Sequence, residues 1–182
     1  MTWRLAVISS TLRRRSFVLW GNCNWANVIR MPAARILIAD DFPALRRGLR
    51  AIPETQTGIE VCGEAGDGEE AVEKALALKP DLVVLDITMP KLDGFEAAQK
   101  ILSASENMPI LIFSMNLTPW HVIKAKKIGC RGYLQKTALT ESLLRAIEAL
   151  LRGDSFFPDD GYERLCNRWA NEVDLWVRNE CC

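Results

Sequence analysis

Short apolar runs alternate with longer amphipathic stretches through the middle of the chain. Charged residues, Gly or Pro bound each run, a pattern typical of strands buried inside a sheet. The runs that predict strands are Arg35–Ala39, Ile59–Gly63, Leu82–Leu85, Ile110–Phe113 and Gly132–Leu134.

Between these runs, apolar residues recur three or four positions apart, which predicts helices. The recurring positions are Leu45, Leu49 and Ile52; Ala71, Val72, Ala75 and Leu76; Phe95, Ala98 and Leu102; Val122, Ala125 and Ile128; and, after the last run, Leu139, Leu143, Ile147 and Leu150. Strict alternation of strand and helix predicts an α/β fold, with a parallel sheet covered by helices on both faces.

Carboxylates follow two of the predicted strands. Asp40 and Asp41 end the first run and Asp86 ends the third, and open α/β sheets bind ligands outside the carboxyl ends of their strands. Adjacent carboxylates repel each other unless a cation or a helix amino terminus neutralises them. Each acid could be an ordinary helix cap. The acid pair could instead form a site for a hard cation, since Mg²⁺ prefers one or two carboxylates plus waters.

Two further polar residues stand at strand ends, Ser114 after Ile110–Phe113 and Lys136 just after Gly132–Leu134. Either residue alone is common at such a position. A series of strand ends that delivers an acid pair, an acid, a Ser and a Lys in that order is improbable by chance, and it favours a common site.

In this order and spacing, the motifs resemble the receiver domain of two-component response regulators. The resemblance extends from Arg35 to Pro158, and the residues that flank the motifs are most similar to those of the NarL/FixJ-like subgroup. The matching pieces are Ile36–Asp41, Gly63–Gly68, Asp81–Pro90, Leu92–Gly94, Ile112–Ser114 and Gly132–Lys136.

The resemblance implies a flavodoxin-like (CheY-like), doubly wound sheet of five parallel strands in the order 2-1-3-4-5. Strands 1 and 3 would then lie side by side at the switch point. It further implies that Asp86 is the phosphoacceptor, phosphorylated by a sensor histidine kinase or a small phosphodonor. Mg²⁺ would be the cofactor, held by Asp40, Asp41, Asp86 and the backbone carbonyl of Thr88.

The resemblance also assigns the remaining strand-end residues. Ser114 and Lys136 would bind phosphoryl oxygens. Ser114 and Tyr133 would form a switch, in which Ser114 moves towards the phosphoryl group and Tyr133 rotates inward. Such a protein takes part in phosphorelay signal transduction and is a signalling protein rather than an enzyme, although it catalyses its own phosphorylation and dephosphorylation.

Three alternatives stay open. The first is a receiver-like interaction module that works without phosphorylation, which usually lacks an acid or the Lys, whereas this chain keeps them all. The second is the receiver part of a truncated DNA-binding transcriptional regulator. The third is a hydrolase with an aspartate nucleophile, disfavoured because Thr88 stands where such sites commonly place a second acid.

The segments that flank residues 34–158 differ in charge. Residues 1–33 contain five arginines and no Asp or Glu, hence a charge of +5. We expect this basic extension to be non-native or disordered and dispensable, because Met31 is a plausible start. Residues 159–182 contain six acids and three arginines, hence −3. Their apolar residues recur at helical spacing, which predicts an amphipathic helical tail.

Proteins of the NarL/FixJ-like subgroup usually carry a helix-turn-helix domain after the receiver, and the sequence leaves no room for one. We therefore expect no specific DNA binding, and output through contacts with a downstream protein target, with a homodimer as a possible arrangement. No stretch is long and apolar enough for a membrane span. We expect a cytoplasmic protein whose six cysteines, with no Cys-x-x-Cys pair, are free thiols.

Overall fold

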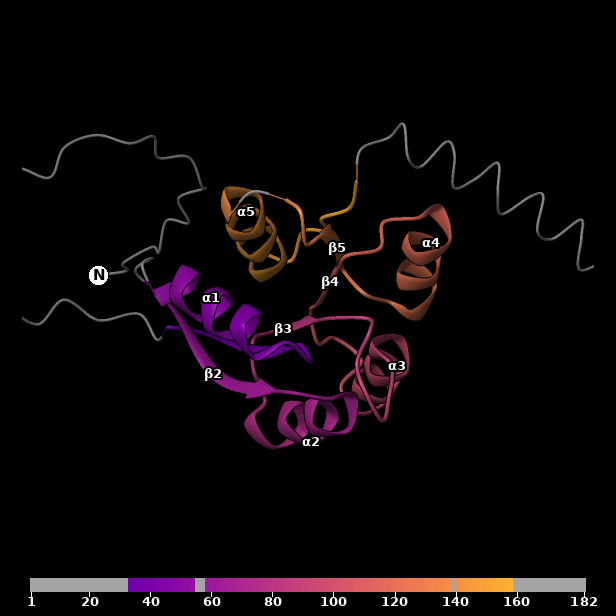
Figure 1. Cartoon of the computed structure of the whole chain (residues 1–182), viewed down its shortest axis with the longest axis horizontal. Coiled ribbons are helices and arrows are strands. Elements are labelled where there is room, and N and C mark those ends of the chain that lie inside the picture. Colours follow the sequence, from indigo (N-terminus) through magenta and orange to yellow (C-terminus); the bar gives the residue numbers. More distant parts are fainter. Residues whose placement is uncertain (1–32, 55–57, 139, 159–182) are drawn as a thin grey trace, which may run out of the picture. The chain divides into compact units, whose positions relative to one another are not determined.

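A computed structural model describes residues 33–54, 58–138 and 140–158, in which strands and helices alternate strictly (Figure 1). The predicted amphipathic tail and all but the last residue of the predicted basic extension lie outside the described residues. The elements are β1 (Ala34–Ala39), α1 (Pro43–Glu54), β2 (Ile59–Ala65), α2 (Gly68–Leu78), β3 (Leu82–Leu85), α3 (Gly94–Ala104), β4 (Ile110–Ser114), α4 (Pro119–Ile128), β5 (Gly132–Gln135) and α5 (Thr140–Leu151).

The sheet has the predicted topology. Its order is β2-β1-β3-β4-β5 and every pairing is parallel, which confirms the doubly wound fold. Consecutive strands must therefore be joined by crossover connections, and each connection is one of the helices. Because β1 and β3 are neighbours, the residues that follow them emerge at the same place on the carboxyl edge.

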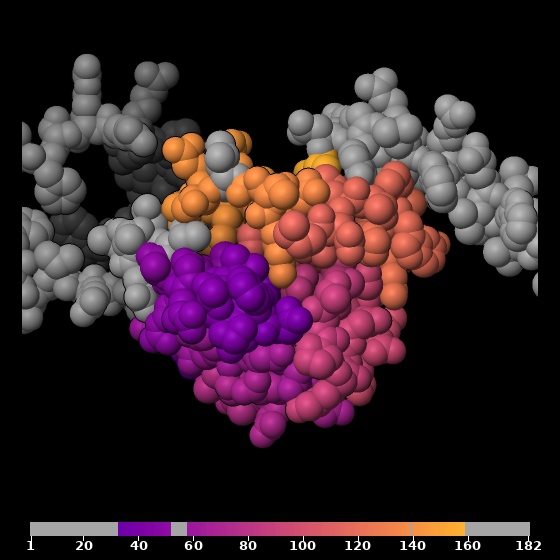
Figure 2. Space-filling view, viewed as in Figure 1, coloured from indigo at the N-terminus to yellow at the C-terminus, as the bar shows by residue number. Residues whose placement is uncertain are grey.

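The helices form two layers, one on each face of the sheet, and each layer packs on its own apolar core. Alternate residues of β1 point to opposite faces, so Leu37 joins one core while Ile36 and Ile38 join the other. The first core is closed by α2, α3 and α4, and the second by α1 and α5 (Figure 1). Figure 2 shows the surface of the β1–α1 segment (indigo to purple) bordering that of α5 (orange), with which α1 is in contact.

Some strands run further than their apolar runs predict. β2 continues to Ala65, because Glu64 and Ala65 pair with Ile38 and Ala39. β4 and β5 likewise end together at the Ser114–Gln135 pair. Backbone pairing with a neighbouring strand continues after the apolar run has ended, and side-chain polarity does not report it.

Polar caps fix where three of the helices begin. Asp67 accepts a hydrogen bond from the backbone of Glu70 and caps α2, while Thr118 caps α4. At α3, Asp93 and Glu96 form a reciprocal capping box. None of the described helices is long and apolar enough to cross a membrane.

The start of α3 is pressed against the loop that follows β3. A Cβ atom on Gly94 would lie 1.9 Å from the carbonyl oxygen of Asp86, far inside van der Waals contact. The Gly94 N–H also donates to the Ile87 carbonyl at 2.9 Å. Only a residue without a side chain allows this approach, so Gly94 sets the position of the Asp86 loop.

Replacement of Gly94 by Ala should therefore be costly, because the added methyl group must displace backbone. We expect Gly94→Ala to lower the free energy of unfolding by about 1–3 kcal/mol or more, measured by urea denaturation. Gly48→Ala is the matched control, since a Cβ at Gly48 in α1 meets nothing within 4 Å. It should stabilise the protein by roughly 0.5–1 kcal/mol through helix propensity. Equal effects of the two substitutions would contradict this account.

Candidate functional site

Two aspartates are brought together by the central strand pair. Ala39 of β1 is in register with Leu85 of β3, so the next residues, Asp40 and Asp86, leave the sheet side by side. The Asp86 N–H donates to the Ala39 carbonyl at 2.9 Å. Asp40 is 1% exposed and Asp86 is 4% exposed, whereas Asp41 is open to solvent. Carboxylate oxygens of all three lie within 4.8 Å of one another.

Lys136 neutralises part of this negative charge. It follows β5, and its Nζ lies 2.6 Å from Asp40 Oδ2 and 2.8 Å from Asp86 Oδ2. The other carboxylate oxygens are held by backbone donors, Asp40 Oδ1 by the Phe42 N–H at 2.9 Å and Asp86 Oδ1 by the Ile87 N–H at 2.7 Å. One partly buried ammonium group therefore bridges two buried carboxylates, each of which is also fixed by the main chain.

The ionisation of these groups reflects their burial. Burial raises the pKa of Asp86, and the opposing hydrogen bond from Lys136 does not cancel this effect. Burial by itself would lower the pKa of Lys136, but hydrogen bonds to Asp40 and Asp86 outweigh it and raise that pKa. The ammonium is therefore firmly protonated, and the cost of burial falls on Asp86. Three carboxylates beside one ammonium leave room in the charge balance for a further cation.

Ser114 and Tyr133 are linked through the loop after β4. Ser114 is the last residue of β4 and is buried, and its Oγ accepts a hydrogen bond from the Asn116 N–H at 3.3 Å. The Asn116 carbonyl in turn accepts a hydrogen bond from the Tyr133 hydroxyl. Tyr133 is 1% exposed, so its side chain is buried in this structure.

Thr88 lies in the loop between Asp86 and α3, and it is exposed. An ion pair between Lys91 and Asp67, at 2.6 Å, ties this loop to the start of α2. The carboxylate site is thus built from the segments that follow β1, β3 and β5, and its β3 loop is tied to the segment that follows β2.

The sequence pattern did not predict a role for Arg46 or for the N–H groups of Phe42 and Ile87, whereas it did place Asn116 and Thr88 beside the site. The identity of a side chain does not indicate where the backbone N–H of the same residue will donate a hydrogen bond. Arg46 contacts the turn of the acid pair from α1 through the Asp40 carbonyl, and no periodic pattern reports such a contact. Only the position of Phe42 directly after the acid pair could have suggested a turn there.

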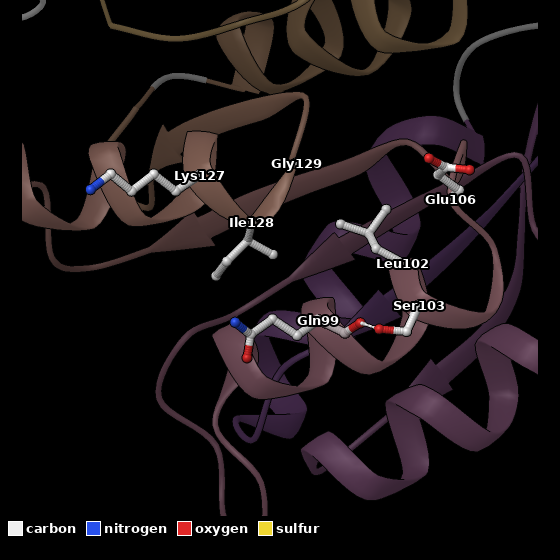
Figure 3. A pocket seen from close by; sticks show the side chains of 7 residues that line it. All are labelled: Gln99, Leu102, Ser103, Glu106, Lys127, Ile128 and Gly129. Carbon is white, nitrogen blue, oxygen red and sulfur yellow. Dashed lines mark hydrogen bonds between the residues drawn. The ribbon is translucent and has the colours of Figure 1, made fainter.

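A separate open groove lies between α3 and α4 (Figure 3). Its apolar walls are Leu102 and Ile128, with Gln99 and Lys127 at its edge. Leu102, Lys127 and Ile128 lie in the carboxyl-terminal turns of α3 and α4, whereas the aspartates precede helix amino termini. The groove therefore does not belong to the carboxylate site.

The response regulator receiver domain model matches residues 36–148, so the chain belongs to this family. An uncharacterized transcriptional regulatory protein of Bacillus subtilis, YxjL, is 41% identical over 123 residues, which cover 68% of this chain and 56% of that protein. A LuxR-family two-component response regulator from Aurantimonas has a similar structure, with a TM-score of 0.69 and 33% identity, covering 76% of this chain and 98% of that one.

The isolated receiver (REC) domain of RcsB from Salmonella enterica, solved in the presence of phosphomimetic BeF₃⁻, is also similar. It gives a TM-score of 0.66 at 26% identity, covering 73% of this chain and 98% of that one. The chain spans little more than half the length of YxjL. The resemblance to receiver domains of the NarL/FixJ-like subgroup that the motifs predict is confirmed.

The raised pKa of Asp86 has a consequence for stability. The folded protein binds this proton more tightly than the unfolded chain does, so stability is lost as the pH rises from the ordinary Asp value through the raised one. At neutral pH without divalent cations, Asp86→Asn removes this cost and should raise the melting temperature by about 2–5 °C. The gain should shrink as the pH falls towards about 4, where the carboxylate protonates in the unfolded chain as well.

Asp154→Asn, at an exposed position after α5, is the control and should leave the melting temperature unchanged. Scanning calorimetry of the three proteins decides the matter. A lower melting temperature for Asp86→Asn at neutral pH would show that the ionised carboxylate stabilises the fold.

Proposed function

We propose that Asp86 accepts a phosphoryl group from a sensor histidine kinase or a small phosphodonor, with Mg²⁺, and that the modified receiver signals through protein contacts. One observation carries the proposal: Asp86, a buried carboxylate at the end of β3, shares the ammonium of Lys136 with a second buried carboxylate, Asp40. Membership of the receiver family supports it.

The residues present fit a magnesium ion. Asp40, Asp41 and Asp86 offer clustered carboxylate oxygens, which are hard donors of the kind that Mg²⁺ prefers. The backbone carbonyl of Thr88, in the loop after Asp86, would complete the set. When bound, the ion supplies positive charge that offsets the repulsion between a carboxylate and an incoming phosphoryl group.

The transfer itself needs a nucleophile and charge compensation. A carboxylate oxygen of Asp86 attacks the phosphorus atom, and the bond from phosphorus to the donor's nitrogen or oxygen breaks as the new acyl phosphate bond forms. The leaving group takes its proton from solvent. Lys136 is already within hydrogen-bond distance of Asp86, so it can follow the charge from the carboxylate to a phosphoryl oxygen.

The response would spread through Ser114. If its hydroxyl turns to a phosphoryl oxygen, it gives up the hydrogen bond from the Asn116 N–H. The loop that accepts the Tyr133 hydroxyl is then free to shift, and phosphorylation biases the surface near α4, β5 and α5 between two states. This surface is where we place the contact with a downstream protein.

A second candidate is the receiver part of a DNA-binding regulator. It is favoured by YxjL, which is described as a transcriptional regulatory protein and of which this chain covers 56%. In that case the same phosphorylation would control DNA binding by a separate domain, and the chemistry at Asp86 would be unchanged.

Acetyl phosphate with Mg²⁺ tests the phosphoacceptor directly. Intact-protein mass spectrometry should show the addition of one base-labile phosphoryl group to the wild type and to Asp154→Asn, and none to Asp86→Asn. If Asp86→Asn is labelled as well as the wild type, the assignment of Asp86 is wrong. If the folded wild type is not labelled at all, the interaction module that works without phosphorylation becomes the better account.

A further inference from the structure

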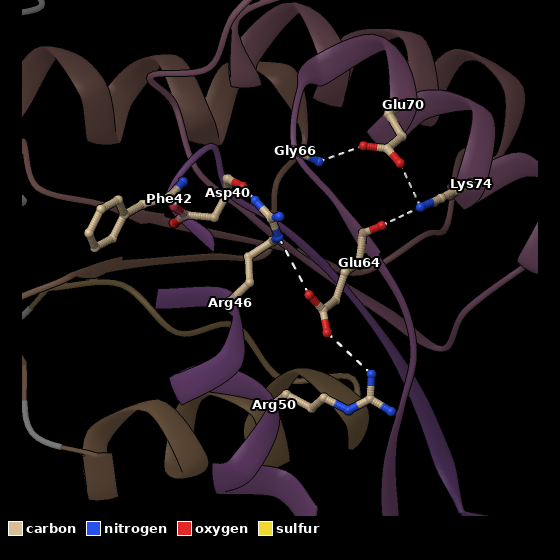
Figure 4. Close-up of polar contacts among 8 residues, drawn as sticks. All are labelled: Asp40, Phe42, Arg46, Arg50, Glu64, Gly66, Glu70 and Lys74. Atoms are coloured by element: carbon tan, nitrogen blue, oxygen red, sulfur yellow. Dashed lines mark hydrogen bonds and ion pairs between the residues drawn. The ribbon is translucent and has the colours of Figure 1, made fainter. Parts of the chain in front are cut away.

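Arg46 reaches back from α1 to the turn that carries the acid pair (Figure 4). One of its terminal nitrogens donates a hydrogen bond to the backbone carbonyl of Asp40 at 2.6 Å. That carbonyl belongs to the peptide unit that joins Asp40 to Asp41. A hydrogen bond to this carbonyl therefore fixes the plane of that peptide unit. The relative orientation of the two carboxylates depends on this plane.

The guanidinium is itself held from the far side by β2. Its Nε lies 3.4 Å from Glu64 Oε2, and the Arg46 side chain is only 18% exposed. Nε is buried and makes no closer hydrogen bond, so this contact is an ion pair. Glu64 is also paired with Arg50 at 3.2 Å, and its carbonyl accepts a hydrogen bond from Lys74 (Figure 4).

Glu64 is thus anchored from both helices that flank β2. Arg50 comes from α1 and Lys74 from α2, and Lys74 is paired in turn with Glu70, which accepts the Gly66 N–H. A chain of polar contacts therefore runs from the β2–α2 connection through Glu64 and Arg46 to the peptide between Asp40 and Asp41.

We propose that Arg46 is a positioning residue for the cation site: held by Glu64, it fixes the Asp40–Asp41 peptide so that both carboxylates face one ion. This inference rests on the magnesium site of the proposed function and deepens it. Arg46 does not touch the ion, and it acts through the acid pair.

A positive charge near a cation site has an opposite effect as well. By Coulomb repulsion alone, removal of Arg46 would strengthen the binding of a dication. The two effects separate in Arg46→Lys, which keeps the charge but lacks the planar guanidinium that donates to the Asp40 carbonyl while it is ion-paired with Glu64. Positioning predicts weaker Mg²⁺ binding in both Arg46→Lys and Arg46→Met. Charge alone predicts tighter binding in Arg46→Met and no change in Arg46→Lys.

Isothermal titration of the full chain with Mg²⁺ alone tests the proposal, with urea denaturation to verify folding. Arg46→Met and Arg46→Lys should each bind Mg²⁺ about fivefold or more weakly, the size of one lost hydrogen bond. Glu64→Gln, which releases the guanidinium without altering it, should weaken binding in the same direction and covers the case in which an Arg46 variant does not fold. Arg47→Met, at the exposed neighbouring position, should bind as the wild type does.

The outcomes separate this inference from the proposed function. Unchanged or tighter Mg²⁺ binding in the folded Arg46 variants, beside a wild type that binds, would overturn the positioning role alone. Absence of Mg²⁺ binding by the folded wild type would overturn the metal site and the positioning role together.

Discussion

The site depends on one ammonium group shared between two buried carboxylates. Asp40 and Asp86 leave adjacent parallel strands, and burial with like charge nearby would make their joint ionisation costly. Lys136 offsets this cost from the end of β5, with Nζ within 2.8 Å of an oxygen of each. The sheet order is what allows this contact, because β1 and β3 present the acids and β4 separates them from β5 by a distance that a lysine side chain spans.

The surrounding structure serves to keep these charges in place. Gly94 lets α3 press on the Asp86 loop, and the Lys91–Asp67 ion pair ties that loop to α2. On the other side, Arg46 and Glu64 hold the turn of the acid pair. Preorganised charge of this kind needs no rearrangement before a phosphoryl group arrives, and this suits a reaction that depends on positioning and charge neutralisation.

Much of this arrangement could be predicted from the sequence, for physical reasons that also mark its limits. Buried parallel strands are short and apolar, so their places along the chain, and the placement of Asp86 and Lys136 at their ends, followed from the pattern. The order of the strands in the sheet followed from the resemblance to receiver domains. The additional pairs at Ala65 and Gln135 did not, because strand pairing outlasts the apolar run. Arg46 was missed because its role comes from contacts with a backbone carbonyl and with Glu64, which lies on another strand. The roles of the site residues stay predictions.

A crystal structure of the protein with Mg²⁺ and beryllofluoride, a mimic of the phosphoryl group, would show directly whether Asp86 is the phosphoacceptor. We expect the beryllium to be bonded to a carboxylate oxygen of Asp86, Mg²⁺ to be contacted by Asp41, and Lys136 Nζ to have moved from Asp40 to a fluorine atom. An adduct on another residue, or a Lys136 that still bridges Asp40 and Asp86 beside the bound mimic, would contradict this expectation.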